Sequence, residues 1–276
     1  MKKTILLITL LTLLSIGSCY YTNKISLSSN VNTTEVYKTI SIDAKAAIAY
    51  NISKEEIIAG KNINCPLLTA SIIKILTCIT AIENIDINKY ILIDEWITSA
   101  VGSKIYLQKG DFVCIKDLLY GLILESGNDA ALALCYAYSP NPNDFILKMQ
   151  ELVNKLKLKN TIINNPSGLD ELNENYSSCY DMAIITKYAM GNSLFREIFG
   201  TKKYNAQVNE RTLYFHHKHR LVQNLPCVIG GKTGYTKKAG RTLVSVFNNN
   251  GELIIVVTMR ASNDWLLHQE LSRYDE

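Results

Sequence analysis

The tetrapeptide Ser71-Ile72-Ile73-Lys74 places a serine three residues before a lysine, at the start of a long apolar stretch. Apolar residues dominate from Ile72 to Ile82, and this pattern predicts a buried helix. Residues three apart share one face of a helix, so the lysine amine can reach the serine hydroxyl. A serine becomes an effective nucleophile when a neighbouring base takes its proton. The tetrapeptide therefore predicts a reactive serine with its base beside it.

Each of these two residues also has an ordinary structural explanation. A serine at a helix start is often a cap, and a lysine one turn later is often a solvated surface charge. Here, however, Lys74 interrupts an apolar run, where a bare charge is costly to bury. The position of Lys74, together with two motifs further along the chain, favours catalysis over capping.

The two further motifs are Ser126-Gly127-Asn128 and Lys232-Thr233-Gly234. The first is also a typical turn, and Ser-x-Asn occurs again at Ser28 and Ser139, so its position between two predicted helices is what favours a site. The second is the only Lys-Thr-Gly in the chain. Its lysine could protect a strand edge. Alternatively, the glycine admits a substrate backbone, the lysine supplies positive charge and the threonine hydroxyl binds a carboxylate.

The three motifs occur in the order found in penicillin-binding proteins and class A β-lactamases. The sequence resembles the serine-type D-alanyl-D-alanine carboxypeptidases, the low-molecular-weight penicillin-binding proteins of the β-lactamase/transpeptidase-like superfamily. The resemblance runs from about residue 40 to about residue 272. The segments that are similar to the family extend beyond the three motifs: they are 102–107, 117–122, 125–131, 165–169, 180–183, 231–236 and 238–240.

The resemblance implies a catalytic role for three residues. Ser71 is expected to attack the carbonyl between two D-alanines and form an acyl-enzyme, with Lys74 accepting its proton. Ser126 is expected to pass a proton to the leaving D-alanine. Burial and the charge of Lys232 should lower the pKa of Lys74 well below about 10.4, as a general base requires.

The resemblance also implies a binding site and its partners. The oxyanion hole is expected from the backbone N–H groups of Ser71 and Tyr235. The expected substrate is a peptidoglycan stem pentapeptide, β-lactams are expected as covalent inhibitors, and neither a cofactor nor a metal ion is expected. The residues expected to bind substrate are Asn128, Lys232, Thr233 and Gly234.

Short apolar runs predict strands near both ends of the chain, and helical patterns lie between them. We expect an α+β fold of the β-lactamase/transpeptidase-like type. One antiparallel sheet is built from both chain ends, with a helical cluster inserted between them. Asn250-Gly251 predicts a hairpin between the last two strands. The expected strands are 40–50, 56–61, 104–107, 227–231, 242–247 and 253–259, and the expected helices are 71–82, 116–125, 129–138, 143–158 and 181–190.

The N-terminal segment indicates export. Lys2 and Lys3 precede an apolar run and small residues, which predicts a signal peptide over residues 1–18. Cys19 follows in a sequence similar to a bacterial lipobox, so it is a candidate lipidation site that would anchor the protein to a membrane; plain cleavage is the alternative. Residues 19–38 are expected to form a tether. Residues 39–276 are expected to form a single catalytic domain without a C-terminal β-rich domain, located in the cell envelope.

Composition excludes some other functions. The formal net charge is +4, and removing Lys2 and Lys3 with the signal leaves +2, which argues against a nucleic-acid partner. The six remaining cysteines form no Cys-x-x-Cys pair, so we expect buried free thiols rather than a disulfide framework or a zinc site. The segment His216-His217-Lys218-His219-Arg220 is expected to be a solvated basic loop rather than a metal site.

Two rival functions share the acylation step. A class A β-lactamase carries a deacylating glutamate four residues before an asparagine, but here Leu169 lies four residues before Asn173. A non-enzymatic penicillin-binding cell-wall sensor would acylate without releasing D-alanine. Ser167 stands where some relatives have histidine, which leaves the role of its side chain open.

Overall fold

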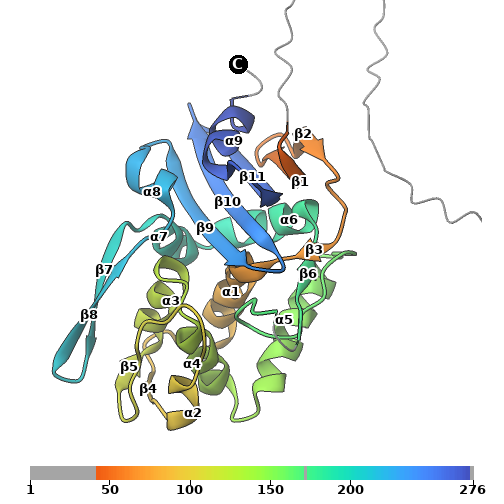
Figure 1. The fold of residues 1–276 in the computed structure, drawn as a ribbon. Coiled ribbons are helices and arrows are strands. Elements are labelled where there is room, and N and C mark those ends of the chain that lie inside the picture. The colour runs from red at the N-terminus through yellow and green to blue at the C-terminus, as the bar shows by residue number, and fades with distance from the viewer. Residues whose placement is uncertain (1–41, 171–172, 274–276) are drawn as a thin grey trace, which may run out of the picture.

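The computed structural model describes residues 42–170 and 173–273 of the 276-residue chain (Figure 1). The expected signal peptide (1–18), the tether (19–38) and Cys19 lie outside the described residues. Within the described ranges, no helix is both long enough and apolar enough to cross a membrane.

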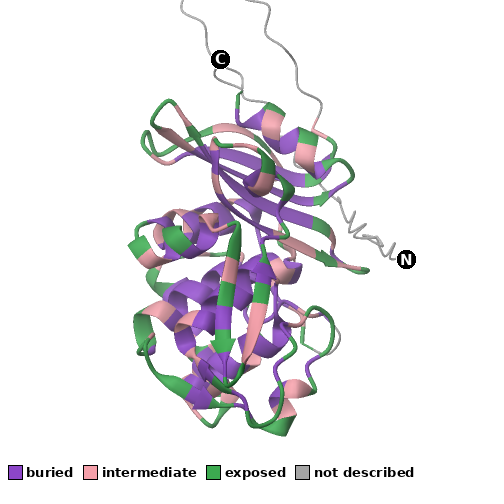
Figure 2. Ribbon diagram, turned by 90° about the vertical axis from the view of Figure 1, so that its left-hand side faces the viewer, coloured by how far each residue is buried: buried purple, intermediate pink, exposed green. Residues whose placement is uncertain are grey.

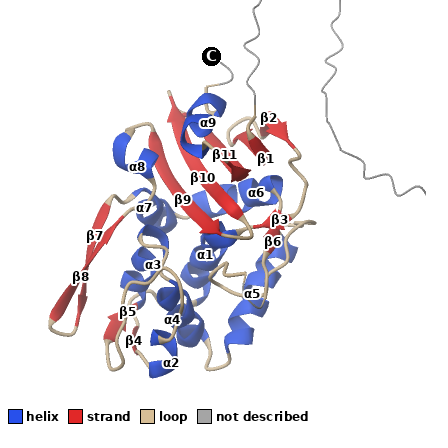
Figure 3. Ribbon diagram, in the orientation of Figure 1, coloured by secondary structure: helices blue, strands red, loops and turns tan. Residues whose placement is uncertain are grey.

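A five-stranded antiparallel sheet joins segments from the two ends of the described chain (Figures 1 and 3). Its order is β2-β1-β11-β10-β9. β1 pairs with β11, with Ile48 opposite Val257. The expected α+β fold, with one sheet built from both chain ends, is confirmed. The strands are β1 (Ala44–Asn51), β2 (Glu56–Lys61), β9 (Val228–Thr236), β10 (Gly240–Asn249) and β11 (Glu252–Ala261).

The hairpin between β10 and β11 forms where the Asn-Gly pair predicts it. Asn249 pairs with Glu252, so Asn250 and Gly251 are the two turn residues. Their φ angles are 52° and 98°. A positive φ at both central positions is the mark of the turn whose twist matches a two-stranded hairpin. This turn fixes the register of β10 against β11.

The central strands are buried on both faces because each face has its own apolar layer. Successive side chains of a strand point to opposite faces. Val244 and Val246 of β10 pack into the core on the helical side, whereas Phe247 packs on the opposite side. The opposite side is covered by α8 (Arg220–Asn224) and α9 (Asp264–Leu271) (Figure 1). Figure 2 shows that both the sheet and the helices beneath it are largely buried.

The helical cluster is organised around α1. Residues 74–81 of this helix are all buried, and the helix contacts α3, α4, α5, α6 and α7. Every side chain on the first two turns of α1, including that of Lys74, therefore lies inside the protein. The elements of the cluster are the 3-10 turn η1 (Ala70–Ile73), α1 (Lys74–Asn84), α2 (Glu95–Thr98), α3 (Ile115–Leu124), α4 (Asn128–Tyr138), α5 (Pro142–Lys155), α6 (Cys179–Met190) and α7 (Ser193–Gly200).

Three small two-stranded sheets lie around this cluster, and the sequence analysis predicted none of them. They pair β3 (Leu67–Leu68) with β6 (Tyr176–Ser177), β4 (Tyr90–Leu92) with β5 (Phe112–Cys114), and β7 (Lys203–Val208) with β8 (Arg211–His216).

The strand expected at 104–107 is wrong. Ile105 and Leu107 are buried and Tyr106 is exposed, so the alternation that suggested a strand is real. The backbone N–H groups of Ile105 and Leu107 nevertheless donate to the carboxylate of Asp129, at 3.0–3.2 Å. A buried side chain thus replaces the neighbouring strand as the hydrogen-bond partner.

Candidate active site

Ser71 and Lys74 lie at the junction of η1 and α1. Lys74 is the first residue of α1, and its Nζ lies 2.9 Å from Ser71 Oγ. Their spacing of three residues places both side chains on one face, as the sequence predicts. The side chain of Lys74 is completely buried, with an exposed fraction of 0%.

The surroundings of Lys74 suit an uncharged amine. Besides Ser71 Oγ, its Nζ contacts Asn128 Oδ1 at 2.7 Å and the backbone carbonyl oxygen of Ser167 at 2.5 Å. Both of these oxygens can only accept hydrogen bonds. A neutral amine satisfies them with its two N–H groups and turns its lone pair toward the Ser71 hydroxyl. This is the arrangement that a general base requires.

The pKa of Lys74 is lowered well below its ordinary value. Burial is the largest cause, followed by repulsion from Lys232 and then from Lys218, while Asp129 opposes the shift. The sequence analysis expected the same two leading causes, burial and Lys232. Burial together with repulsion from Lys218 also lowers the pKa of Lys232 itself, to about 7.

Ser126 lies in the turn between α3 and α4. Its φ of 62° is unusual for a residue other than glycine. The turn closes where the Gly127 N–H donates to the carbonyl of Gly121. Next along the chain, Asn128 is buried, and its Nδ2 donates to the Val101 carbonyl at 2.6 Å. This second bond fixes the amide so that Oδ1 faces Lys74.

Strand β9 carries the third motif along the edge of the sheet. Lys232 is buried, and its Nζ donates to the Thr233 carbonyl at 2.9 Å. Gly234 allows the strand to approach η1, because a Cβ there would lie 2.9 Å from Ser71 N and 2.3 Å from Thr242 Oγ1. The glycine of this motif is therefore required by the close packing of the sheet edge against the turn that carries Ser71.

A cavity of about 340 Å³ lies where these elements meet. Tyr235, which is 67% exposed, lies at this cavity. Lys74, Asn128 and Lys232 are buried and do not line the cavity. All three predicted motifs thus converge on one place in the fold. The residues that line the cavity are Ser71, Ser103, Ser126, Lys218, Thr233, Gly234, Tyr235, Arg241, Thr242, Asp264 and Trp265.

Comparison with known proteins identifies the family. Residues 30–263 match the sequence profile of the peptidase S11 family, D-alanyl-D-alanine carboxypeptidase. The chain belongs to this family.

Curated relatives agree with this assignment. The chain is 33% identical over 226 residues to the D-alanyl-D-alanine carboxypeptidase DacF of Bacillus subtilis, covering 80% of this chain and 58% of that protein. It is 29% identical over 217 residues to the carboxypeptidase DacB2 of Mycobacterium tuberculosis, covering 78% of this chain and 74% of that protein. The chain therefore spans less than two thirds of the length of the Bacillus relative.

Solved structures share the fold. The Streptomyces K15 DD-transpeptidase superposes with a TM-score of 0.81 at 26% identity, covering 86% of this chain and 98% of that one. A D-alanyl-D-alanine carboxypeptidase from Mycobacterium tuberculosis H37Rv superposes equally well, with a TM-score of 0.81 at 26% identity, covering 89% and 95%.

Several residues of this S11-family cavity were not predicted as site residues. Arg241 of β10 forms an ion pair with Asp264 of α9, and the Cζ of its guanidinium lies 5.8 Å from the centroid of the Trp265 ring. Arg241 also pairs across the strands with Tyr235. Lys218 lines the cavity as well and forms an ion pair with Glu125. No sequence motif marks these positions, because they reach the cavity only through the pairing of β9 with β10 and the packing of α9.

The expectation of a solvated basic loop at 216–220 is wrong for two of its histidines. His216, Lys218 and Arg220 are exposed, but His217 and His219 are buried. The alternation continues from Phe215, which is buried at the end of β8. Within residues 42–170 and 173–273, no group of three or more His, Cys, Asp or Glu side chains is arranged to hold a metal ion.

The loop around Ser167 supports Lys74 through the backbone. Asn165 Oδ1 accepts from the backbone N–H groups of Ser167 and Gly168 and from Ser167 Oγ. Gly168 has a φ of 82°, and a Cβ there would lie 1.9 Å from the Ala70 carbonyl oxygen. These contacts hold the Ser167 carbonyl against Lys74. Ser167 contacts Lys74 through its backbone carbonyl and not through its side chain, whose role the sequence did not predict.

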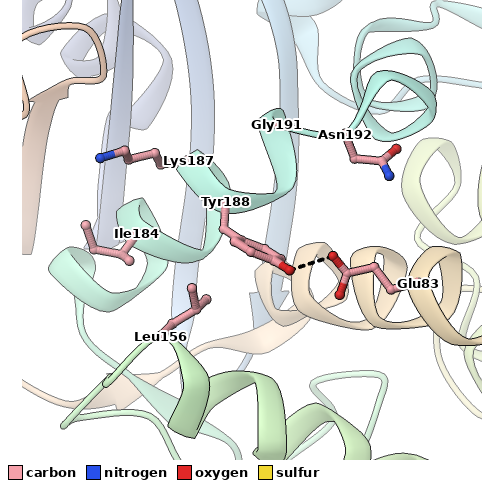
Figure 4. A pocket seen from close by; sticks show the side chains of 7 residues that line it. All are labelled: Glu83, Leu156, Ile184, Lys187, Tyr188, Gly191 and Asn192. Carbon is pink, nitrogen blue, oxygen red and sulfur yellow. Dashed lines mark hydrogen bonds between the residues drawn. The ribbon is translucent and has the colours of Figure 1, made fainter.

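A second cavity among the described residues lies elsewhere. It measures about 580 Å³ and lies between α1, α6 and the end of α5 (Figure 4). Tyr188 Oη donates to Glu83 at 2.6 Å inside it. None of the residues predicted from the three motifs lines this cavity. Residues of all three motifs line the smaller cavity at Ser71 instead.

The cysteines of the described residues are free, but only half of them are buried as expected. The structure describes six of them, Cys65, Cys78, Cys114, Cys135, Cys179 and Cys227, and Cys78, Cys135 and Cys179 are buried.

Proposed function

We propose that this protein is a serine D-alanyl-D-alanine carboxypeptidase that removes the terminal D-alanine from peptidoglycan stem pentapeptides. The observation that carries the proposal is the contact between Ser71 Oγ and the buried Lys74 amine, at 2.9 Å. An amine with a lowered pKa beside a hydroxyl can take its proton, and the serine oxygen then attacks a carbonyl. Membership of the S11 family supports D-alanyl-D-alanine as the bond that is cut.

Each further residue has a role in this proposal. The terminal carboxylate of the substrate binds to Thr233 Oγ1 in the field of Lys232, and Asn128 orients the peptide chain. As the tetrahedral intermediate forms, the backbone N–H groups of Ser71 and Tyr235 donate to its oxygen, each contributing about 3 kcal/mol. The close approach of Gly234 to Ser71 N supports the location of this pair.

The intermediate then collapses to an acyl-enzyme. Ser126 lines the cavity, and its hydroxyl passes a proton to the nitrogen of the departing D-alanine. Water attacks the ester, which releases the shortened peptide and restores the Ser71 hydroxyl. A β-lactam presents a similar amide carbonyl and carboxylate, so it acylates Ser71 in the same way.

The first experiment measures free D-alanine released from a stem pentapeptide. We expect the wild-type protein to release many molecules of D-alanine per molecule of enzyme, and Ser71→Ala to release none. A protein that is acylated by a fluorescent penicillin but releases no D-alanine would be a sensor instead. Rapid steady-state turnover of nitrocefin would identify a β-lactamase. Covalent penicillin labelling of Ser71→Ala at the wild-type level would show that Ser71 is not the nucleophile.

The proposed substrate places the protein in the cell envelope. We further propose that residues 1–18 direct export and that a lipid on Cys19 anchors the mature protein to the membrane. Metabolic labelling with a fatty-acid precursor is expected to label the wild-type protein but not Cys19→Ser. Equal labelling of the two, or labelling of neither, would contradict the anchor.

A further inference from the structure

The segment His216–His219 binds the turn that carries Ser126 through hydrogen bonds and an ion pair. The backbone N–H of His216 donates to Glu125 Oε1 at 2.7 Å, and that of Lys218 donates to the Leu124 carbonyl at 3.1 Å. The Lys218 Nζ donates to the Glu125 carbonyl at 2.7 Å and lies 3.3 Å from Glu125 Oε2. Because Glu125 directly precedes Ser126, the position of this segment determines where the Ser126 turn lies.

Two buried histidines hold the segment in its extended form. His217 Nδ1 accepts from the backbone N–H of His219 at 3.1 Å, and its Nε2 donates to the Phe199 carbonyl at 3.2 Å. His219 Nδ1 accepts from the backbone N–H of Val222 at 3.2 Å and so caps α8. Both Nδ1 atoms face donors, so each ring fits only when it is neutral with its proton on Nε2.

The same requirement extends across the sheet. His219 Nε2 lies 2.9 Å from Ser245 Oγ, which lies 2.8 Å from His268 Nδ1. His268 Nε2 in turn lies 3.0 Å from Thr258 Oγ1. Every bond is satisfied when His219 donates to Ser245, Ser245 donates to His268 and His268 donates to Thr258. This buried chain therefore has one consistent direction, with both of its rings, His219 and His268, neutral.

Among residues 42–170 and 173–273, no acidic side chain raises the pKa of His217 or His219. His217 and His219 face each other, His268 of α9 acts on His219, and Lys232 of β9 acts on both. The ring of Trp265 packs edge-on against His219 at 5.0 Å. Burial first, and then these like charges, lower the pKa of His217 to about 4 and that of His219 well below its ordinary value.

We propose that His217 and His219 are positioning residues that hold Lys218 and the Ser126 turn in place at neutral pH and release them when they are protonated in acid. A proton added to either Nδ1 turns an acceptor into a donor that faces a backbone N–H. The His217–His219 contact and the cap of α8 then open, and Lys218 loses its fixed position at Glu125. The inference rests on the proposed function, because Ser126 is the proton donor there.

A first test follows backbone amides of the wild-type protein by hydrogen exchange between pH 7.5 and pH 4.5. After correction for the intrinsic effect of pH on exchange, the protection factors of the amides of Lys218, His219 and Val222 are expected to fall at least tenfold on acidification. The amides of β10 and β11 should lose less over the same range. Parallel loss in both groups, or constant protection of the segment, would overturn the inference.

A second test uses the double variant His217→Asn/His219→Asn. Asparagine Oδ1 can accept the same backbone N–H groups, and asparagine is a good helix cap that does not titrate. The rate of acylation by a fluorescent penicillin is measured at pH 7.5 and at pH 4, where about half of the His217 rings are protonated. We expect the ratio of the rate at pH 7.5 to the rate at pH 4 to be about twofold smaller in the variant than in the wild-type protein.

The matched control is His216→Asn, an exposed histidine in the same segment, whose ratio should equal that of the wild-type protein. A folded double variant with the wild-type ratio would overturn the inference. If the double variant does not fold, the exchange experiment on the wild-type protein decides. That experiment needs no substrate. Pentapeptide left intact at pH 7.5 would therefore overturn only the proposed function, and pH-insensitive protection would overturn only the inference.

Discussion

Lys74 illustrates how much of the proposed chemistry depends on one buried amine. The atoms around its Nζ are two obligate acceptors and one hydroxyl. A permanently charged side chain could satisfy the same oxygens but could not take the proton of Ser71. The loss of the proton from Lys74, rather than its position alone, is what the site has to provide.

Replacing Lys74 by arginine tests this requirement. A guanidinium stays protonated in proteins, so we expect the rate of penicillin acylation to fall by at least about 10²-fold, the ordinary contribution of a general base. The control is Lys148→Arg, a lysine on α5 that pairs with Glu151. Lys74→Arg with wild-type acylation would mean that another group takes the proton. A thermal melt confirms that the variant is folded.

Gly168 is the second residue on which the site depends. A Cβ at this position would collide with the Ala70 carbonyl, and its φ of 82° is unfavourable for other residues. We expect Gly168→Ala to lower the free energy of unfolding by more than about 2 kcal/mol and to slow acylation, because the Ser167 carbonyl must move away from Lys74.

Gly110 provides the matched control for this prediction. Its φ is 86°, but a Cβ there would meet nothing within 4 Å. Gly110→Ala therefore carries the backbone cost alone, about 1–2 kcal/mol, with unchanged acylation. Equal effects of the two substitutions in urea denaturation would show that the collision with Ala70 is relieved without cost.

At the scale of elements, Asp129 holds the segment 104–107 against α4. Its carboxylate accepts from the backbone N–H groups of Ile105 and Leu107. The preceding residue, Ser103, lines the cavity, and its carbonyl accepts from Asn128 N. One buried side chain of α4 thus supports a whole wall of the active site.

Asp129→Ala should therefore destabilise the protein strongly. The buried N–H groups of Ile105 and Leu107 lose their acceptor, at about 1–3 kcal/mol each, so we expect a loss of about 2–6 kcal/mol in urea denaturation. Asp129→Asn keeps one acceptor oxygen and should lose less. A change below about 0.5 kcal/mol for the alanine variant would show that water replaces the carboxylate.

The same segment shows where prediction from the sequence succeeds and fails. The Asn250-Gly251 hairpin was predictable because the two residues in the turn decide its geometry. The alternation at 104–107 correctly predicted which side chains are buried, but the backbone partner is Asp129, more than twenty residues away. The three motifs could be found because each is short and local, whereas the approach of Arg241 and Lys218 to the cavity depends on the packing of distant elements.

The burial of His217 and His219 was not predicted, for a similar reason. A cluster of basic residues favours solvent when it is taken alone. Burial of His219 depends on Ser245 of β10 and His268 of α9. No residue close to His219 in the sequence indicates these contacts. The alternation of buried and exposed residues that continues from β8 is the one local signal that could have indicated it.

For the whole molecule, the buried histidines predict a loss of stability in acid. The pKa values of His217 and His268 are lowered to about 4 and about 3, mainly by burial. Above pH 6.5 the rings are neutral in both the folded and the unfolded chain. As the pH falls below this value, the unfolded chain binds protons that the folded protein does not, so the free energy of unfolding decreases.

Urea denaturation at pH 7 and pH 5 measures this effect. Each of His217 and His268 is expected to remove about 2 kcal/mol of stability between these values. His268→Gln should make the difference smaller by about that amount, whereas the exposed His216→Asn should leave it unchanged. Equal stability of the wild-type protein at pH 7 and pH 5 would mean that the rings accept protons without unfolding.

The pairing of β1 with β11 has a consequence for the order of events during synthesis. β1 can pair with β11 only after β11 has been synthesised. Ser71 is likewise synthesised about 160 residues before the Lys232–Tyr235 segment of β9. Contacts between segments so distant in the chain form late in folding. The nucleophile and its base therefore leave the ribosome without an edge strand to bind a substrate. The site becomes able to react only after almost the whole chain has been made.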